Sequence, residues 1–296
     1  LEYNLNELVG GGMKLKQLKG MAADSVPIGE SWEISAIQGS ESVVKNGALA
    51  GRTLSSLVEE YGPALVDERV FQRHGTEFPL LVKFIDAAHD LSIQVHPNDA
   101  LAHVRHSKLG KTEMWYVMHA DPGASLLAGV QAPLTPDEYD RRVHDGTIVS
   151  ALARHEVHEG DVFFIPAGRI HAICGGIMVC EIQQSSDVTY RLFDYHRLDL
   201  DGKPRELHTE LAKDAIDYRV LPDYRTHYVM PQSGAVMVAD CDYFTVNVLK
   251  VESTEALSRH LMKEGSFITL SCLTGTARIT AGAESIILPT GFSCLI

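Results

Sequence analysis

One short segment constrains the fold of this chain more than any other. Residues 160–171 read GDVFFIPAGRIH. The run from Asp161 to Ile165 is rich in β-favouring side chains, and Pro166 and Gly168 then favour a tight corner. His171 stands where the next strand is expected to begin. The segment therefore predicts two strands joined by a sharp turn, with a histidine just beyond it.

Short strands dominate the rest of the sequence. β-branched and aromatic side chains recur in separate runs. We expect strands over residues 79–86, 92–96, 113–118, 161–165, 177–183, 243–251 and 266–280. The helical periodicity is confined to a few stretches, at residues 52–61, 100–106, 135–143, 147–154 and 209–215. Many short strands with a small helical insertion near 135–154 predict a mainly β protein, a sandwich or barrel closed by jelly-roll connections.

The length of 296 residues allows one large β unit or two modest ones. Residues 198–235 are polar and rich in turn formers, which indicates a segment that crosses between two units. We expect a catalytic unit over 1–225 and a second, degenerate unit over 226–296. The chain starts without Met and stops five residues after Gly291, where a matching proline would stand, so we expect residues to be missing at both ends.

The charge balance limits the possible partners. Acidic residues outnumber basic ones by 39 to 26, for a net charge of −13, which argues against a nucleic acid or an acidic membrane. An anionic ligand would therefore need a local positive pocket. The five cysteines form no CxxC pair, which predicts free thiols in a reducing compartment. With no apolar run of membrane-spanning length and no visible signal peptide, we expect a cytoplasmic protein. The oligomeric state stays open.

Side chains typical of metal sites are found in three separated segments. Because alternate residues of a strand share a face, Gln94 and His96 look the same way, and so do Lys111 and Glu113. With His171, three strands can bring two imidazoles, a carboxylate and an amide oxygen to one point. That donor set suits a borderline divalent cation, zinc first, at one ion per chain.

The segment that ends at His171 fits the second motif of the cupin superfamily, Gly-x5-Pro-x-Gly-x2-His. Five further segments resemble type I phosphomannose isomerase (mannose-6-phosphate isomerase) in its short bacterial form. They are FPLLVKFIDA at 78–87, LSIQVHPND at 91–99, GKTEMWY at 110–116, GESWEIS at 29–35 and TYRLFDY at 189–195. One departure is Val9, where the family's usual motif has a tryptophan before two glycines. This difference affects a packing contact and none of the residues expected to take part in the reaction.

The resemblance implies two cupin jelly-roll barrels and a zinc-dependent interconversion of mannose 6-phosphate and fructose 6-phosphate. It implies that the metal ligands are the same four residues, Gln94, His96, Glu113 and His171. The substrate would be a small sugar phosphate.

The implied reaction moves a proton between C1 and C2 of the open-chain sugar through an enediolate. It needs a proton carrier and a group that stabilises the developing charge. The resemblance gives Arg191 the stabilising role, since a guanidinium keeps its charge and offers forked donors. Glu181 is the candidate proton carrier, and Asp187 is a second candidate. Lys111 lies close enough to the metal group to assist ring opening or to bind a sugar oxygen.

The phosphate group needs cationic and hydroxyl donors. Ser92 shares the face of Gln94 and His96, Lys83 lies on the preceding strand, and Arg197 follows Arg191 by six residues. By resemblance these three residues, together with Lys111, form the phosphate site.

Two other classes of function fit part of the pattern. A non-catalytic cupin that binds a metal or a sugar would share the ligands, and an Fe(II) cupin oxygenase would use two histidines and one carboxylate. Gln94 and the phosphate-type residues favour the isomerase.

Overall fold

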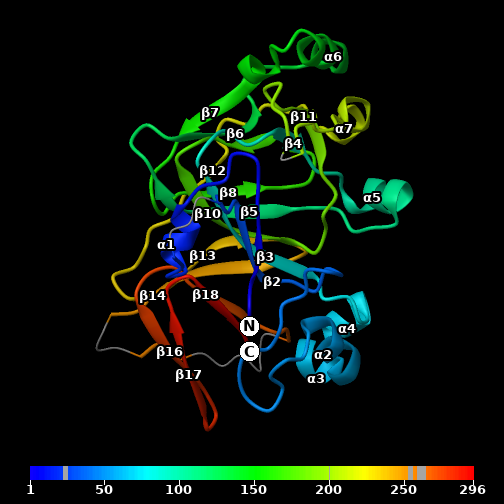
Figure 1. Cartoon of the computed structure of the whole chain (residues 1–296). Coiled ribbons are helices and arrows are strands. Elements are labelled where there is room, and N and C mark those ends of the chain that lie inside the picture. The colour runs from blue at the N-terminus through cyan, green and yellow to red at the C-terminus, as the bar shows by residue number, and fades with distance from the viewer. Residues whose placement is uncertain (23–25, 200, 253–255, 259–264) are drawn as a thin grey trace.

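The structure is a computed structural model that describes residues 1–22, 26–199, 201–252, 256–258 and 265–296. Its centre is a pair of antiparallel sheets (Figure 1). The larger sheet has the order β1-β2-β3-β10-β5-β8-β12. Its strands are β1 (Asn4–Asn6), β2 (Glu30–Ile34), β3 (Leu80–Ala87), β10 (Ile177–Gln184), β5 (Glu113–Ala120), β8 (Val162–Ile165) and β12 (Arg225–Thr226).

The smaller sheet has the order β11-β4-β9-β6-β7. Its strands are β11 (Tyr190–Phe193), β4 (Ile93–Val95), β9 (His171–Ile173), β6 (Ser125–Val130) and β7 (Leu152–Glu156). From β8 to β12, consecutive strands alternate between the larger and the smaller sheet. This alternation is the connectivity of a jelly roll. A buried cluster joins Trp115 and Phe163 of the larger sheet to Leu126 and Ile173 of the smaller one, so the sheets face each other across a common core. The predicted mainly β jelly-roll architecture is confirmed.

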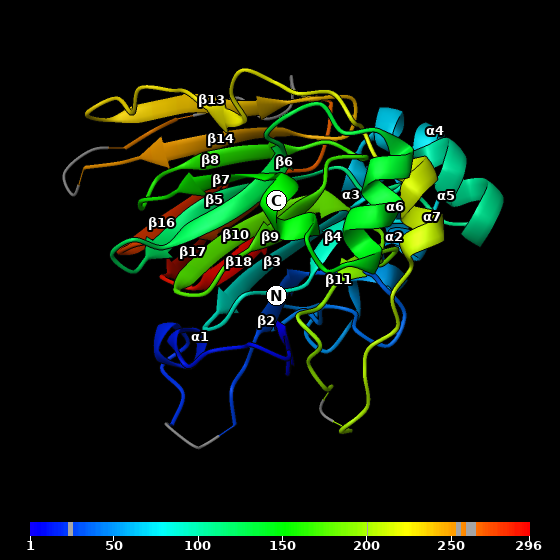
Figure 2. The same ribbon diagram turned by 90° about the horizontal axis from the view of Figure 1, so that it is seen from above.

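Most helices gather at one end of the sheets (Figure 2). They are α2 (Leu54–Tyr61), α3 (Pro63–Val66), α4 (Glu68–His74), α5 (Asp99–His106), α6 (Pro136–His144), the 3-10 turn η1 (Ile148–Ala151) and α7 (Thr209–Ala215); α1 (Lys14–Leu18) lies apart from them. The hydroxyl oxygen of Thr135 accepts a hydrogen bond from the Glu138 N–H and so starts α6 as the sequence predicts. The helix predicted over 147–154 is wrong beyond Ala151, because residues from Leu152 onward pair with β6.

The C-terminal strands form three pairs. They are β13 (Gly234–Asp240) with β14 (Thr245–Lys250), β15 (Thr269–Cys272) with β18 (Phe292–Leu295), and β16 (Thr276–Ala281) with β17 (Glu284–Pro289). The single strand predicted over 266–280 is thus two strands, separated by a turn in which Gly275 has a φ of 75°.

The C-terminal pairs pack against the outer face of the larger sheet. Val238 and Phe244 share one buried cluster with Phe84, Met114 and Cys180 of that sheet. Strand β12 spans the predicted boundary at residue 225 and pairs with β8, and the division into 1–225 and 226–296 stays a prediction. Within the described ranges, no helix has both the length and the apolar character needed to cross a membrane.

Candidate active site

Strands of both sheets bring the predicted metal ligands together between the sheets. Gln94 on β4 pairs in register with His171 at the start of β9, and His96 follows β4 directly. Glu113 begins β5 in the opposite sheet. The alternation of side chains along each strand turns these groups inward, as the sequence predicts.

Glu113 is at the centre of this group. Its Oε1 lies 3.3 Å from Nε2 of His171 and its Oε2 lies 3.5 Å from Nε2 of His96. The side chains of all three residues are buried, and one ligand atom of each lies within 4.8 Å of the others. The amide nitrogen of Gln94 lies 3.3 Å from Nε2 of His171, and a half-turn of the amide would present its oxygen instead.

Backbone carbonyls orient both imidazoles. Nδ1 of His96 lies 3.0 Å from the Val188 oxygen, and Nδ1 of His171 lies 2.8 Å from the Arg169 oxygen. A carbonyl only accepts, so Nδ1 carries the proton and Nε2 turns a lone pair toward Glu113. Burial keeps the rings neutral: it lowers the pKa of His96 to about 3, with a further contribution from Lys111, and it lowers the pKa of His171.

The donor set fits a divalent cation. Both oxygens of Glu113 are buried without an aligned hydrogen bond from any described residue, and two imidazole lone pairs converge on them. The Lys111 ammonium offsets the charge at Oε2, while Oε1, among the described residues, faces only the His171 imidazole. A buried carboxylate oxygen without a donor is costly, and a cation bound by nitrogen and carboxylate oxygen removes that cost. The arrangement therefore provides a candidate metal centre, with Gln94 beside it.

Two lysines and a second carboxylate flank this group. Nζ of Lys111 lies 3.0 Å from Oε2 of Glu113 and 3.1 Å from Nε2 of His96. The same Nζ lies 4.0 Å from Oε1 of Glu181. Nζ of Lys83 lies 3.4 Å from that oxygen. The other oxygen of Glu181 accepts a 2.8 Å hydrogen bond from the Trp115 indole.

These neighbours give the two carboxylates different acidities. Burial raises the pKa of Glu181, and the charge of Glu113 raises it further. Burial would also raise the pKa of Glu113, but the Lys111 ammonium, together with the imidazoles of His96 and His171, outweighs it and holds that pKa well below its usual range. Two neighbouring carboxyl groups with opposite shifts are typical of sites that transfer protons.

Arg191 lies beside the metal group in the smaller sheet. It pairs in register with Gln94, and its Nε donates a 3.3 Å hydrogen bond to the hydroxyl of buried Ser92. Burial lowers the pKa of Arg191, and the positive charge of Arg205 lowers it further, which identifies Arg205 as a second cation close by. Sequence reasoning missed Arg205, because its turn-rich surroundings show no periodicity that would direct its side chain.

Two of the residues predicted to bind the phosphate, Arg197 and Lys83, have acidic partners in the structure. Arg197 donates a 2.7 Å hydrogen bond to Asp194 and also contacts the Asp90 carbonyl oxygen, and Asp194 binds Arg205 as well. Lys83 lies in the larger sheet between Glu30 and Glu181, while Ser92 precedes a strand of the smaller sheet. The two therefore approach the site from opposite sheets.

The structure does not bring Asp187 to the metal group. Its side chain is 46 % exposed, and both carboxylate oxygens bind Nζ of Lys108, at 2.6 and 2.8 Å. Asp187 was predicted as a second proton carrier from its position four residues before Arg191. The chain turns between the two, so that the neighbouring Val188 carbonyl faces His96 while the Asp187 side chain points to solvent.

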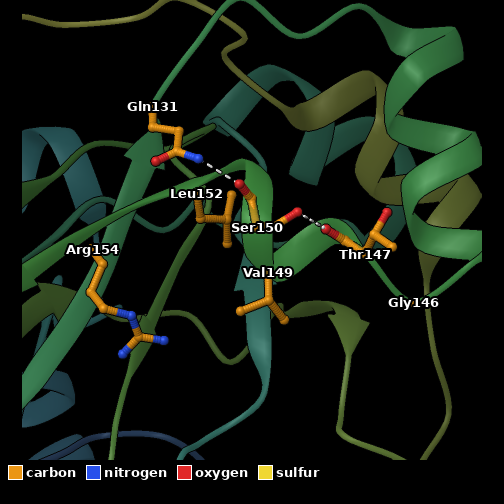
Figure 3. Close-up of a pocket in the computed structure, with 7 residues that line it drawn as sticks. All are labelled: Gln131, Gly146, Thr147, Val149, Ser150, Leu152 and Arg154. Carbon is orange, nitrogen blue, oxygen red and sulfur yellow. Dashed lines mark hydrogen bonds between the residues drawn. The ribbon is translucent and has the colours of Figure 1, made fainter.

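A cavity of about 500 Å³ lies elsewhere in the fold (Figure 3). It is lined by Gln131, Gly146, Thr147, Val149, Ser150, Leu152 and Arg154. Within the lining of the cavity, the Gln131 amide donates a hydrogen bond to the Ser150 carbonyl oxygen. None of the predicted site residues lines this cavity.

The fold and the buried His–Glu–His group define a jelly-roll protein with a candidate metal centre between its two sheets. Comparisons with known proteins narrow this class. Residues 6–157 match the family described as phosphomannose isomerase type I, catalytic domain. The mannose-6-phosphate isomerase ManA of Bacillus subtilis is 36 % identical over 93 % of this chain and 85 % of its own length. A mannose-6-phosphate isomerase of Streptococcus mutans is 34 % identical over 98 % of this chain and 89 % of its own.

Solved structures agree with this assignment. The crystal structure of the mannose 6-phosphate isomerase from Bacillus subtilis superposes with a TM-score of 0.88 at 32 % identity, covering 100 % of this chain and 92 % of that one. A mutant phosphomannose isomerase from Salmonella typhimurium gives a TM-score of 0.79 at 17 % identity over 100 % of this chain and 93 % of its own, which shows a shared fold. The chain belongs to the type I phosphomannose isomerase family, and it is an isomerase.

Proposed function

We propose that this enzyme interconverts mannose 6-phosphate and fructose 6-phosphate with one bound zinc ion. The observation that carries the proposal is the buried group in which Glu113 contacts His96, His171 and Lys111. Family membership supports the substrate class, a small sugar phosphate. A cytoplasmic location stays a prediction.

The proposed ligands are Gln94, His96, Glu113 and His171. Zinc bound there would supply a Lewis acid that polarises the sugar oxygens at C1 and C2. The chain's own contribution is to hold both imidazoles in the neutral tautomer whose Nε2 faces the centre. Lys111 adds a positive charge beside the same centre, where it can donate to a sugar oxygen.

Glu181 is the proposed proton carrier. It is buried, which raises its pKa, and two lysines lie within 4.0 Å of its Oε1. A buried carboxyl group with a shifted pKa beside cationic groups is typical of residues that transfer protons. The Trp115 indole fixes the orientation of the carboxylate. Asp187 is left out of this role because its carboxylate is bound to Lys108 at the surface.

Arg191 and Ser92 are the proposed contacts to the anionic parts of the substrate. They are joined to each other and lie next to Gln94, so a sugar bound at the metal group can reach them. Arg191 would stabilise the enediolate, since its fork of donors suits paired oxygens. Arg197 and Arg205 surround Asp194 nearby, and together these arginines provide the local positive charge that a phosphate needs in a chain with a net charge of −13.

A coupled assay on mannose 6-phosphate combined with elemental analysis tests this proposal. Isomerase activity in protein that contains zinc supports it. A protein that binds iron and consumes dioxygen would instead be an Fe(II) oxygenase, and a metal-loaded protein with neither activity would be a binding module. Either result would contradict the proposed function.

A further inference from the structure

The backbone of Lys111 is held by an unusual set of hydrogen bonds. Lys111 lies outside any helix or strand, since β5 begins at Glu113. Three consecutive N–H groups are nevertheless bound: Gly110 donates to Asp99 Oδ1 at 2.8 Å, Lys111 to the Pro97 oxygen at 3.1 Å, and Thr112 to Gln184 Oε1 at 2.8 Å. These bonds fix where the Lys111 side chain starts.

Gly110 allows this loop to press against the start of α5. A Cβ at Gly110 would lie 2.5 Å from the Asp99 nitrogen and 2.6 Å from the Asn98 carbonyl carbon, closer than real atoms approach. Any side chain would push the loop, and Lys111 with it, away from Asp99.

Asp99 joins this loop to a distant part of the chain. Besides Gly110, its Oδ1 accepts a 2.9 Å hydrogen bond from the Gln184 amide, the same side chain that holds Thr112. Its Oδ2 accepts a 2.7 Å hydrogen bond from the hydroxyl of Tyr243. Tyr243 lies between β13 and β14, in the C-terminal strand pairs.

Other contacts fix the Tyr243 end of this connection. The guanidinium of Arg73 on α4 donates a 2.6 Å hydrogen bond to the Asp242 carbonyl oxygen and lies 5.8 Å from the centre of the Tyr243 ring. Burial, reinforced by the bond to Asp99, raises the pKa of Tyr243 to about 12, so the hydroxyl keeps the proton that it donates.

We propose that Tyr243 is a positioning residue for Lys111, acting through Asp99 and Gln184. In this arrangement the C-terminal strands do more than cover the larger sheet: one of their turns fixes the ammonium group that lies 3.0 Å from Glu113. The inference rests on the proposed role of Lys111 in isomerisation.

Tyr243→Phe tests the inference, because it removes only the hydroxyl. Tyr228→Phe is the control, since that hydroxyl also donates a hydrogen bond across the fold, to Gly160 O at 2.6 Å, but holds neither Asp99 nor Gln184. Each variant loses one hydrogen bond, so both are expected to unfold at a lower urea concentration than the wild type. Only Tyr243→Phe is expected to lower kcat/KM for mannose 6-phosphate, by about tenfold, since small displacements of a catalytic group slow the reaction strongly.

A double-mutant cycle separates positioning from general stability. In a Lys111→Met background, Tyr243→Phe is expected to lower the residual kcat/KM no further, because the group that it positions is already gone. An equal loss with and without Lys111 would overturn the inference, and so would equal kcat/KM values for Tyr243→Phe and Tyr228→Phe. If the wild-type protein has no isomerase activity, it is the proposed function that fails.

Gln184→Met provides an independent variant should Tyr243→Phe not fold. It cuts the bonds to Thr112 and Asp99 while leaving the C-terminal strands intact. Its kcat/KM is expected to fall in the same way and to show the same dependence on Lys111. Unchanged kcat/KM in Gln184→Met would also overturn the inference.

Discussion

Nζ of Lys111 and Oε2 of Glu113 lie 3.0 Å apart, with both side chains buried. The ammonium group therefore faces the same carboxylate that contacts the two imidazoles. Glu113 offsets the Lys111 charge and, in our proposal, also binds the metal. Changes at this carboxylate should affect both metal binding and Lys111, which we propose to contact the substrate.

Glu113→Gln is expected to abolish metal binding. The amide cannot supply the negative charge, and it leaves the buried Lys111 ammonium without its nearest partner. Zinc retained after dialysis, measured by elemental analysis, should fall to below about a tenth of the wild-type content. Glu156→Gln, at an exposed position of β7, is the control and should retain zinc fully. Normal zinc content in Glu113→Gln would exclude Glu113 as a ligand.

Glu181→Gln is expected to keep zinc but to lose turnover. Its carboxylate is turned toward two lysines rather than into the His–Glu–His group. Removal of a general base lowers kcat by roughly 10²–10⁴, while Asp187→Asn should stay near the wild-type rate. Steady-state kinetics on both variants distinguish the two carboxylates. A large loss in Asp187→Asn with normal kcat in Glu181→Gln would reverse the assignment.

The stability of the metal-free protein is expected to fall as the pH drops below 6.5. Burial lowers the pKa of His96 from 6.5 to about 3, so the unfolded chain binds a proton that the native state does not. The free energy of unfolding therefore decreases from pH 6.5 down to about 3, and His96 alone accounts for about 1 kcal/mol between pH 6.5 and about 5.5.

Urea denaturation of metal-depleted protein at several pH values measures this effect. His96→Gln removes the titrating group, so its free energy of unfolding should depend less on pH than that of the wild type. Equal pH dependence in the two proteins would show that His96 is not held neutral by burial.

Ser92→Asp is expected to weaken binding of the phosphorylated sugar. The new carboxylate would pair with Arg191, whose Nε already donates to this position, and would repel the substrate anion. Because a hydrogen bond to a charged group contributes about 1.5–3 kcal/mol, KM should rise by at least about tenfold. Ser92→Ala serves as the control for loss of the hydroxyl alone and should show a smaller rise. An unchanged KM in Ser92→Asp would remove Ser92 from the substrate site.

Much of the fold could be predicted from the sequence because strand periodicity and capping are local. The alternation in β4 and β5 and the N-cap of α6 by Thr135 are examples. The helix predicted over 147–154 is wrong at residues 152–154, because pairing with a distant strand outweighs local helical preference.

The site was predictable where it follows strand alternation and unpredictable where it depends on loops. Residues on or next to strands, such as Gln94 and Glu113, converge as expected. Asp187 and Arg205 lie in loops, where spacing along the chain does not determine the direction of a side chain. The link from Tyr243 to Asp99 spans 144 residues and left no pattern in the sequence.

Anomalous diffraction at the zinc edge, from crystals grown with zinc, tests the central claim most directly. The account predicts one peak per chain, bound by Gln94, His96, Glu113 and His171, with Nε2 of each histidine and the Glu113 carboxylate at about 2.0–2.2 Å. Well-ordered crystals without a peak between these three side chains, or with zinc bound only elsewhere, would contradict it.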